Sequence, residues 1–96
     1  MIDPKRIRHK GLARLWQRGD TSRLKPEWVS RIKRVLSALN VAVTAEELHI
    51  PGFGWHQLTG DRKGTYSVRI SGNWRLTYRW DENCPYDIEL EDYHGR

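Results

Sequence analysis

The sequence predicts an α+β fold in two layers, with two to three N-terminal helices packed on a mainly antiparallel sheet of four to five strands. Apolar residues recur at helical spacing before Pro51, and the period changes to two residues after it. Helices followed by a run of strands are typical of folds in which helices cover one face of an antiparallel sheet. The chain has 96 residues, the size of one small domain, so we expect a single domain over residues 1–96.

The N-terminal half is expected to begin with a short edge strand over residues 2–8, where polar and apolar residues alternate weakly. A first helix should follow near residues 9–18, because Leu12, Leu15 and Trp16 stand at i, i+3 and i+4 and share one helical face. The glycine and polar residues from 18 to 22 then favour a turn that ends this helix.

A second helix is predicted to begin at Pro26, since the fixed φ of proline suits the first helical position. Its apolar face is formed by Trp28, Ile32, Val35, Leu36 and Leu39. Thr44, with Glu47 three residues later, fits a capping box for a short helix that ends near His49.

Three segments after Pro51 alternate between apolar and polar residues, which predicts half-buried antiparallel strands. These segments are 66–71, 74–80 and 87–91. A shorter strand is expected over residues 55–59, joined to the next strand by a loop over residues 60–64.

The turn at residues 71–73 determines which side chains face the core. A three-residue loop pairs Ile70 with Trp74 and Val68 with Leu76, so that apolar residues share one face of the sheet. We therefore predict a bulged turn in which Gly72 or Asn73 adopts a positive φ.

The charge is distributed unevenly along the chain. Residues 1–40 hold 11 basic and 3 acidic side chains, whereas residues 81–96 hold 1 and 6, and the formal net charge of the chain is +5. A basic N-terminal half indicates a polyanionic partner such as nucleic acid, although a solvated helix surface would carry the same charges. The sheet arginines Arg69 and Arg79 are equally compatible with an ion-pair ladder across the strands.

Several classes of protein are excluded by the sequence. No apolar run approaches the roughly 20 residues of a membrane span, and residues 1–10 lack the apolar stretch of a secretory signal, so we expect a cytoplasmic protein without membrane contact. Cys84 is the one cysteine, and hence no disulfide forms within the chain. Because no zinc-ligand spacing, P-loop or dinucleotide fingerprint is present, we expect neither a metal nor another cofactor.

The remaining chemistry lies in histidines, aromatic residues and a basic sheet face. His94 follows Asp92, which could orient it, and Tyr93, which could hydrogen-bond or stack, while His56 begins the first strand. His9 and His49 lie beside helix ends and are expected to be surface residues. Histidine suits proton transfer near neutral pH, and RNA can be cleaved by its own 2′-hydroxyl without a metal-activated water. This set of residues is therefore sufficient for metal-free RNA cleavage.

A family resemblance runs over nearly the whole chain. It rests on 8–12, 38–39, 48–53, 58–64, 66–70, 73–76 and 91–94, which read RHKGL, AL, LHIPGF, LTGDRKG, YSVRI, NWRL and EDYH. These motifs resemble the HigB toxins of the RelE-like superfamily of type II toxin–antitoxin systems. The resemblance implies a small sheet backed by helices and a ribosome-dependent mRNA endonuclease that inhibits translation.

By that resemblance, Asp92, Tyr93 and His94 match the active-site terminus of the family, and His56 falls where many members have a second functional histidine. We expect His94 to act as general acid or base, Asp92 to orient it, and Tyr93 to stack on a base or position the phosphate. Arg75 matches a phosphate-holding arginine, and Arg69 would join it in stabilising the phosphorane.

One position departs from the family pattern. Many members have a lysine three residues after the histidine that corresponds to His56, whereas this chain has Thr59. Lys63 or Arg62 in the following loop could replace that lysine.

The resemblance also implies partners. These are a HigA-type helix-turn-helix antitoxin, mRNA on the ribosome with its ribosomal RNA, and operator DNA reached through the antitoxin complex. The alternative is a degenerate toxin without catalysis, or an RNA- or DNA-binding module, that acts as a transcriptional co-repressor with the antitoxin. A secreted ribonuclease acting alone is disfavoured because the chain lacks a signal and disulfides.

Overall fold

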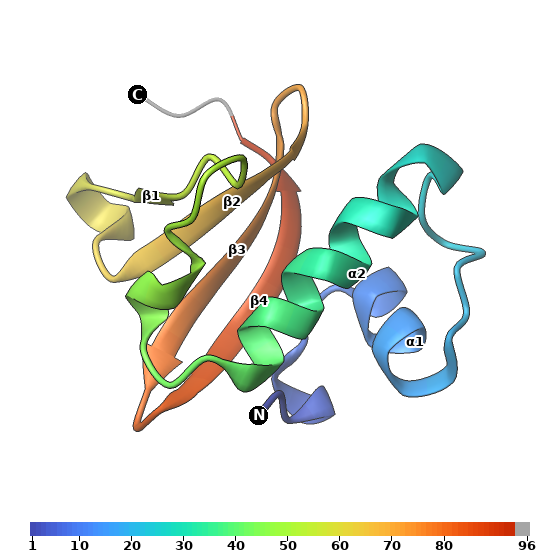
Figure 1. Ribbon diagram of the computed structural model, residues 1–96, viewed down its shortest axis with the longest axis horizontal. Coiled ribbons are helices and arrows are strands. Elements are labelled where there is room, and N and C mark those ends of the chain that lie inside the picture. The colour runs from blue at the N-terminus through green and yellow to red at the C-terminus, as the bar shows by residue number, and fades with distance from the viewer. Residues whose placement is uncertain (94–96) are drawn as a thin grey trace.

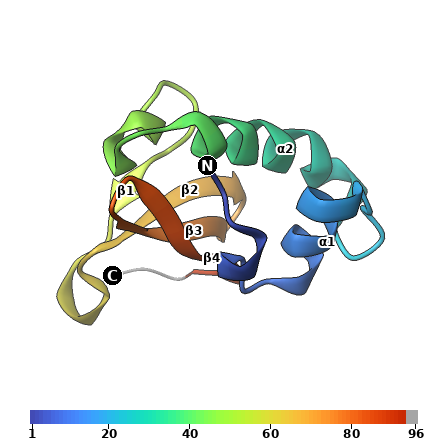
Figure 2. The same cartoon turned by 90° about the horizontal axis from the view of Figure 1, so that it is seen from below.

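The computed structural model describes residues 1–93, which form two α-helices and a four-stranded antiparallel sheet. The elements are η1 (Pro4–Arg6), α1 (Lys10–Arg18), α2 (Pro26–Val41), η2 (Ala45–Leu48), β1 (His56–Gln57), η3 (Gly60–Arg62), β2 (Thr65–Ser71), β3 (Trp74–Asp81) and β4 (Cys84–Asp92), where η marks a 3-10 helix. The strands lie in the order β1-β2-β3-β4, and α2 crosses one face of the sheet (Figure 1). Figure 2 shows the two layers, with α2 over the sheet and α1 at the side of β4. The predicted α+β architecture is confirmed.

Local signals set the helix ends. The ring Nδ1 of His9 accepts a hydrogen bond from the backbone N–H of Leu12 at 3.2 Å, so His9 caps α1 instead of standing free on the surface. Burial lowers the pKa of His9, and the nearby charge of Glu89 opposes this shift. The predicted capping box forms, because the Glu47 carboxylate accepts from the N–H of Thr44 at 2.9 Å, but the helix it caps is a single 3-10 turn.

The predicted edge strand over residues 2–8 is wrong. Pro4 has no N–H to give to a strand ladder and begins the 3-10 turn η1, which the Asp3 side chain caps by accepting from the N–H of Lys5 at 3.0 Å. The contact of this segment with the sheet is limited to an isolated parallel bridge between Ile7 and Ile88, where the N–H of Arg8 donates to the carbonyl oxygen of Ile88 at 2.8 Å.

The hairpin between β2 and β3 has a different loop from the predicted one. Val68 pairs with Leu76 as expected, but Trp74 pairs with Ser71, and the predicted pair of Ile70 with Trp74 is wrong. The loop has two residues, with Gly72 at φ +55°, and the register shifts between Arg69 and Ser71. A bulge that absorbs one residue restores the apolar register which a two-residue loop would otherwise lose.

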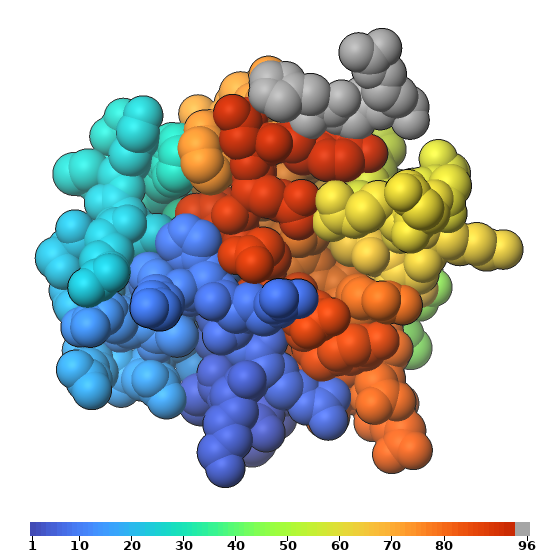
Figure 3. All heavy atoms as spheres, turned by 180° about the vertical axis from the view of Figure 1, so that it is seen from behind, coloured from blue at the N-terminus to red at the C-terminus, as the bar shows by residue number. Residues whose placement is uncertain are grey.

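The core lies between α2 and the inner face of the sheet. The fully buried side chains of this layer include Ile32, Leu36, Leu39, Val68, Leu76, Tyr78 and Ile88. The opposite face carries Ser67, Arg75, Thr77, Glu89 and Glu91. Within residues 1–93 neither α-helix lies over this face (Figures 2 and 3). Neither α-helix within residues 1–93 combines the length and apolar composition needed to cross a bilayer.

Candidate active site

A hollow of about 460 Å³ lies at the end of the sheet where β1, the turn between β2 and β3, and the end of β4 meet. Its lining includes His56, Thr59, Ser67, Asn73, Arg75 and Tyr93. His56, Arg75 and Tyr93, three of the residues predicted to carry chemistry, are thus brought together from distant parts of the sequence. The hollow also contains Thr59, at the position where the family resemblance implies a lysine.

The strand pairing places these side chains. His56 lies opposite Ser67 in the short ladder between β1 and β2, and its side chain is exposed. The predicted strand over residues 55–59 is thereby reduced to two paired residues. Beyond β4, the backbone N–H of Tyr93 donates to the carbonyl oxygen of Asn73 at 2.8 Å, which ties the chain after β4 to the turn that borders the hollow.

The guanidinium of Arg75 is held on two sides. Its Nε donates to the hydroxyl of Ser67 at 2.8 Å, and its Nη2 donates to the carbonyl oxygen of Gly54. Burial, followed by the positive charge of Arg69, lowers the pKa of Arg75, while Tyr93 opposes the shift. Since a guanidinium has five N–H donors in a fixed fork, the bonds to Ser67 and Gly54 orient a cation beside the hollow without exhausting its donors. Such a group can stabilise negative charge that develops on a phosphate.

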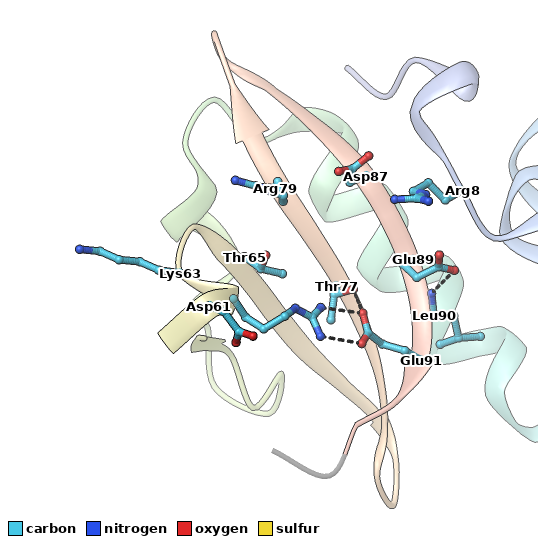
Figure 4. Close-up of a pocket in the computed structure, with 11 residues that line it drawn as sticks. Arg8, Asp61, Lys63, Thr65, Thr77, Arg79, Asp87, Glu89, Leu90 and Glu91 are labelled. Atoms are coloured by element: carbon cyan, nitrogen blue, oxygen red, sulfur yellow. Dashed lines mark hydrogen bonds and ion pairs between the residues drawn. The ribbon is translucent and has the colours of Figure 1, made fainter. Parts of the chain in front are cut away.

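Arg62 belongs to a polar network on the open face of the sheet. It donates to both carboxylate oxygens of Glu91, at 3.1 and 3.0 Å, and Thr77 donates to the same carboxylate at 2.6 Å (Figure 4). The hydrogen bond to Glu91 raises the pKa of Arg62, although burial opposes it. The guanidinium also lies 6.0 Å from the ring centroid of Tyr93, so Arg62 borders the candidate site through that ring.

Lys63 and Arg69 lie outside the hollow. Lys63 lies at the rim of a larger groove of about 660 Å³ on the open face, between η3 and β4, and its side chain extends away from the other lining residues (Figures 3 and 4). The groove is also lined by Arg8, Arg79, Asp87, Glu89 and Glu91. Arg69 is exposed and lines a third hollow of about 380 Å³ together with Arg31. The larger groove is lined by both acidic and basic side chains. The smaller hollow holds His56, Arg75 and Tyr93, which were predicted to act in catalysis.

The ion-pair ladder considered for Arg69 and Arg79 is wrong for residues 1–93. Arg69 lies opposite Arg75, a residue of the same charge, and the Arg79 guanidinium lies 5.7 Å from the ring centroid of Tyr86. Glu91 lies opposite Arg75 in the register but is bound by Arg62 instead.

Two further predicted residues lie at the end of the chain. Asp92 is the last residue of β4 and pairs with Trp74. His94 lies outside the described residues, so its role stays a prediction. Over residues 1–93 no three His, Cys, Asp or Glu side chains gather as metal ligands would. Cleavage without a metal ion stays a prediction.

The loop over residues 52–54 is a part of the site that sequence reasoning treated as a turn. Arg31 of α2 donates to the carbonyl oxygen of Gly52 at 2.6 Å, and Arg75 donates to that of Gly54. A Cβ at Gly54, which has φ +60°, would lie 3.2 Å from the Cβ of Arg69. The two glycines around Phe53 are the sequence signal for this close approach of backbone and side chains.

Comparisons with known proteins identify the family of this chain. Residues 5–94 match the model of the family described as RelE-like toxin of type II toxin-antitoxin system HigB. The chain is 37% identical over 90 residues to the Endoribonuclease HigB of Proteus vulgaris, and the alignment covers 94% of this chain and 98% of the relative. The chain therefore belongs to the HigB-like toxins of type II toxin–antitoxin systems. Membership in this family implies an antitoxin partner and an RNA substrate.

Proposed function

We propose that this toxin is a ribosome-dependent mRNA endonuclease that inhibits translation and is neutralised by a HigA-type helix-turn-helix antitoxin. The observation that carries the proposal is the shared hollow of His56, Arg75 and Tyr93, with the Arg75 guanidinium fixed by Ser67 and Gly54. The name of the Proteus vulgaris relative, an endoribonuclease, agrees with this activity.

The proposed reaction uses the 2′-hydroxyl of the RNA as nucleophile. The 2′ oxygen attacks the adjacent phosphorus, the bond from phosphorus to the 5′ oxygen breaks, and the products end in a 2′,3′-cyclic phosphate and a 5′-hydroxyl. His94 acts as general acid or base with Asp92 orienting it, and His56 is the second proton-transfer group. Arg75 stabilises the charge on the phosphorane, and Tyr93 positions the phosphate or stacks on a base.

Arg62, Lys63 and Arg69 surround this centre. Arg62, which borders the Tyr93 ring, and Lys63 on the adjoining groove replace the lysine absent at Thr59 and draw phosphate towards the site. Arg69, next to Arg75 in the strand ladder, adds positive charge for the RNA backbone. Phosphate contacts of this kind make RNA binding strongly dependent on salt.

The distribution of charge supports the wider assignment. The basic residues of the first 40 positions contact ribosomal RNA, and operator DNA is bound indirectly through the antitoxin complex. Residues 1–96 act as one toxin domain in the cytoplasm, where ribosomes and mRNA are present.

The test is cleavage of mRNA on translating ribosomes, mapped by primer extension. The wild-type protein is compared with the His94→Ala variant, and free RNA serves as control. Cleavage that requires both the ribosome and His94 supports the proposal. Full cleavage by a folded His94→Ala variant overturns the role of that histidine, and cleavage of free RNA overturns the dependence on the ribosome.

A degenerate toxin that acts only as co-repressor is the second candidate, and Thr59 is the observation that favours it. Thr59 lines the hollow where the family resemblance implies a cation, so the site has one fewer group for phosphate binding or proton transfer. Expression without the antitoxin separates the two candidates. An endonuclease arrests growth, whereas a co-repressor without catalysis is tolerated.

A further inference from the structure

A column of four stacked rings runs from the core to the surface beside the candidate active site. The ring centroids are 4.7 Å apart for His49 and Trp55, 5.7 Å for Trp55 and Tyr66, and 5.5 Å for Tyr66 and Tyr78, with interplanar angles of 20°, 19° and 26°. Tyr78 is fully buried, Trp55 and Tyr66 are half-buried, and His49 is exposed. The column therefore has a closed inner end and an open outer end at His49.

The column is held in place at its buried end. The indole Nε1 of Trp55 donates to the hydroxyl of Tyr78 at 2.9 Å, and that hydroxyl donates to the carbonyl oxygen of Ala45 at 2.7 Å. At the outer end, the backbone of His49 is fixed because His49 directly follows η2 and its N–H donates to the carbonyl oxygen of Glu46 at 3.0 Å. A ligand that stacks on such rings does not have to order them first, which lowers the entropic cost of binding.

The open end of the column lines a second hollow of about 460 Å³. Its lining consists of His49, Ile50, Pro51, Gly54, Trp55 and His56. The volume lies in the range of about 300–1,000 Å³ that is usual for small-ligand sites. Ile50 is 41% exposed at its rim, an apolar side chain left in solvent.

His56 connects this second hollow to the candidate active site, because its side chain lines both. Gly54 makes a second connection, since it lines the second hollow and its carbonyl oxygen accepts a hydrogen bond from Arg75. A polymer bound across His56 can therefore have its reacting phosphate in one hollow and an adjacent residue in the other.

We propose that this second hollow is a nucleobase subsite, in which the base of a nucleotide next to the scissile phosphate stacks on His49 at the open end of the ring column, beside Trp55. The inference rests on the proposed function and deepens it, because it names where the RNA continues beyond the cleavage centre. Single-stranded RNA is commonly bound by stacking its unpaired bases on aromatic and histidine rings. Stacking tolerates any base, since every base has a π-face.

Positive charge around the hollow favours RNA over an apolar segment of a partner protein. Arg75 donates to the carbonyl oxygen of Gly54, which lines the hollow, and Arg31 donates to that of Gly52 in the same loop. Arg31 and Arg69 line the neighbouring hollow of about 380 Å³. Binding of an apolar protein segment there, instead of a base, is an outcome that the experiment below distinguishes.

The first test is binding of an all-adenine trinucleotide with 2′-O-methyl groups, which lacks the nucleophile and is not cleaved. NMR follows the indole N–H of Trp55 during the titration. We expect this resonance to shift in the wild-type protein, and we expect His49→Ala to weaken binding about tenfold by removing one stacking ring. His49→Phe should restore binding to within about threefold, because it retains an aromatic face.

The control is Val43→Ala, a truncation at an apolar side chain that is 62% exposed and lines neither hollow. It should bind the trinucleotide as the wild-type protein does. An unmoved Trp55 resonance, or equal binding by His49→Ala and the wild-type protein, overturns the subsite. If the Trp55 resonance shifts on addition of the antitoxin but not of the trinucleotide, the hollow is a protein interface and the nucleobase subsite is overturned.

The second test is cleavage of ribosome-bound mRNA by the same variants. We expect His49→Ala to raise KM about tenfold with a smaller change in kcat, and His49→Phe to rescue it. Cleavage by His49→Ala with unchanged KM overturns the subsite and leaves the endonuclease proposal intact. Trinucleotide binding that depends on His49, with no cleavage by the folded wild-type protein, overturns the endonuclease proposal and leaves the subsite.

Discussion

Arg62 and Glu91 are joined by two parallel hydrogen bonds, from Nη1 to Oε1 at 3.1 Å and from Nη2 to Oε2 at 3.0 Å, although the two residues are 29 positions apart in the sequence. The pair links η3 to the end of β4, directly before the segment of Asp92 and Tyr93. The Glu91 side chain is 25% exposed, that of Arg62 40%. Geometry of this bidentate kind makes a partly exposed ion pair more stabilising than an ordinary surface pair.

Replacement of Glu91 by Gln removes the negative charge that pairs with Arg62 and should lower the free energy of unfolding at neutral pH. The loss should be only about 1 kcal/mol, because solvent screens the partly exposed guanidinium of Arg62. Burial favours the neutral carboxyl of Glu91, but hydrogen bonds from Arg62 and Thr77 outweigh it and hold the pKa of Glu91 below its usual 4.5. A carboxylate with a lowered pKa stabilises the fold above its unfolded pKa, and this contribution is lost as the pH falls through the folded pKa.

Urea denaturation across the acid range measures this contribution. The wild-type protein should lose its advantage over Glu91→Gln as the pH falls below 4.5, and the two stability curves should converge once the pH is below the lowered pKa of Glu91 in the folded protein. A constant difference between the two proteins across this range would show that the carboxylate charge is not the cause.

Replacement of Tyr78 by Phe should lower the free energy of unfolding by about 1–3 kcal/mol, because it leaves the Trp55 indole and the Ala45 carbonyl without their partner. Burial raises the pKa of Tyr78, which keeps the phenol in its donating form at neutral and mildly alkaline pH. The control is Tyr86→Phe, on the half-buried ring that lies beside Arg6 and Arg79. Equal losses for the two variants in urea denaturation would contradict the role of the Tyr78 hydroxyl.

Introduction of lysine at Thr59 should raise the rate of RNA cleavage about tenfold, because it adds a cation to the hollow that holds His56 and Arg75. Thr59 is exposed and its side chain caps nothing, so the change in stability should stay within about 0.5 kcal/mol. Ser30→Lys on the exposed surface of α2 adds the same charge elsewhere and serves as control. An equal gain from both lysines would indicate general attraction of RNA instead of a local effect.

Attack by the 2′-hydroxyl should yield fragments that end in a 2′,3′-cyclic phosphate and a 5′-hydroxyl. The cleavage should proceed without an added divalent metal ion. Mass spectrometry of the fragments checks the ends. A single 2′-O-methyl group at the cleaved nucleotide should abolish the cut, since it removes the nucleophile. Fragments that carry a 5′-phosphate would rule out this chemistry.

Periodicity alone predicted most of the fold, because the helical and strand patterns both arise from burial of one face. Helix α2 begins at Pro26 and buries the predicted residues, and β2, β3 and β4 follow the predicted alternation. Pairing across the turn was harder to predict. A bulge near Ile70 adds one residue without disturbing the alternation, so the two loop lengths give nearly the same sequence pattern.

The candidate site was predicted in part. His56 and Tyr93 were first considered from the residue types and then matched by family resemblance, whereas Arg75 was chosen by resemblance. The three meet because antiparallel pairing brings β1, β3 and the end of β4 to one end of the sheet. The bonds of Arg31 and Arg75 to the loop over residues 52–54 could not be predicted, because their acceptors are backbone carbonyls whose positions depend on the folded loop. The ring column could not be predicted either, because His49 and Trp55 come into contact only when the turn at Pro51 has formed.

The most direct test of the account compares two arginines on the same strand, Arg75 in the hollow and Arg79 in the neighbouring groove. Single-turnover cleavage of ribosome-bound mRNA is measured for Arg75→Ala and Arg79→Ala, with urea denaturation to confirm that both fold. We predict that Arg75→Ala lowers the cleavage rate about a hundredfold, whereas Arg79→Ala retains it within about threefold. Equal rates for the two folded variants would contradict the assignment of the hollow around His56, Arg75 and Tyr93 as the cleavage centre.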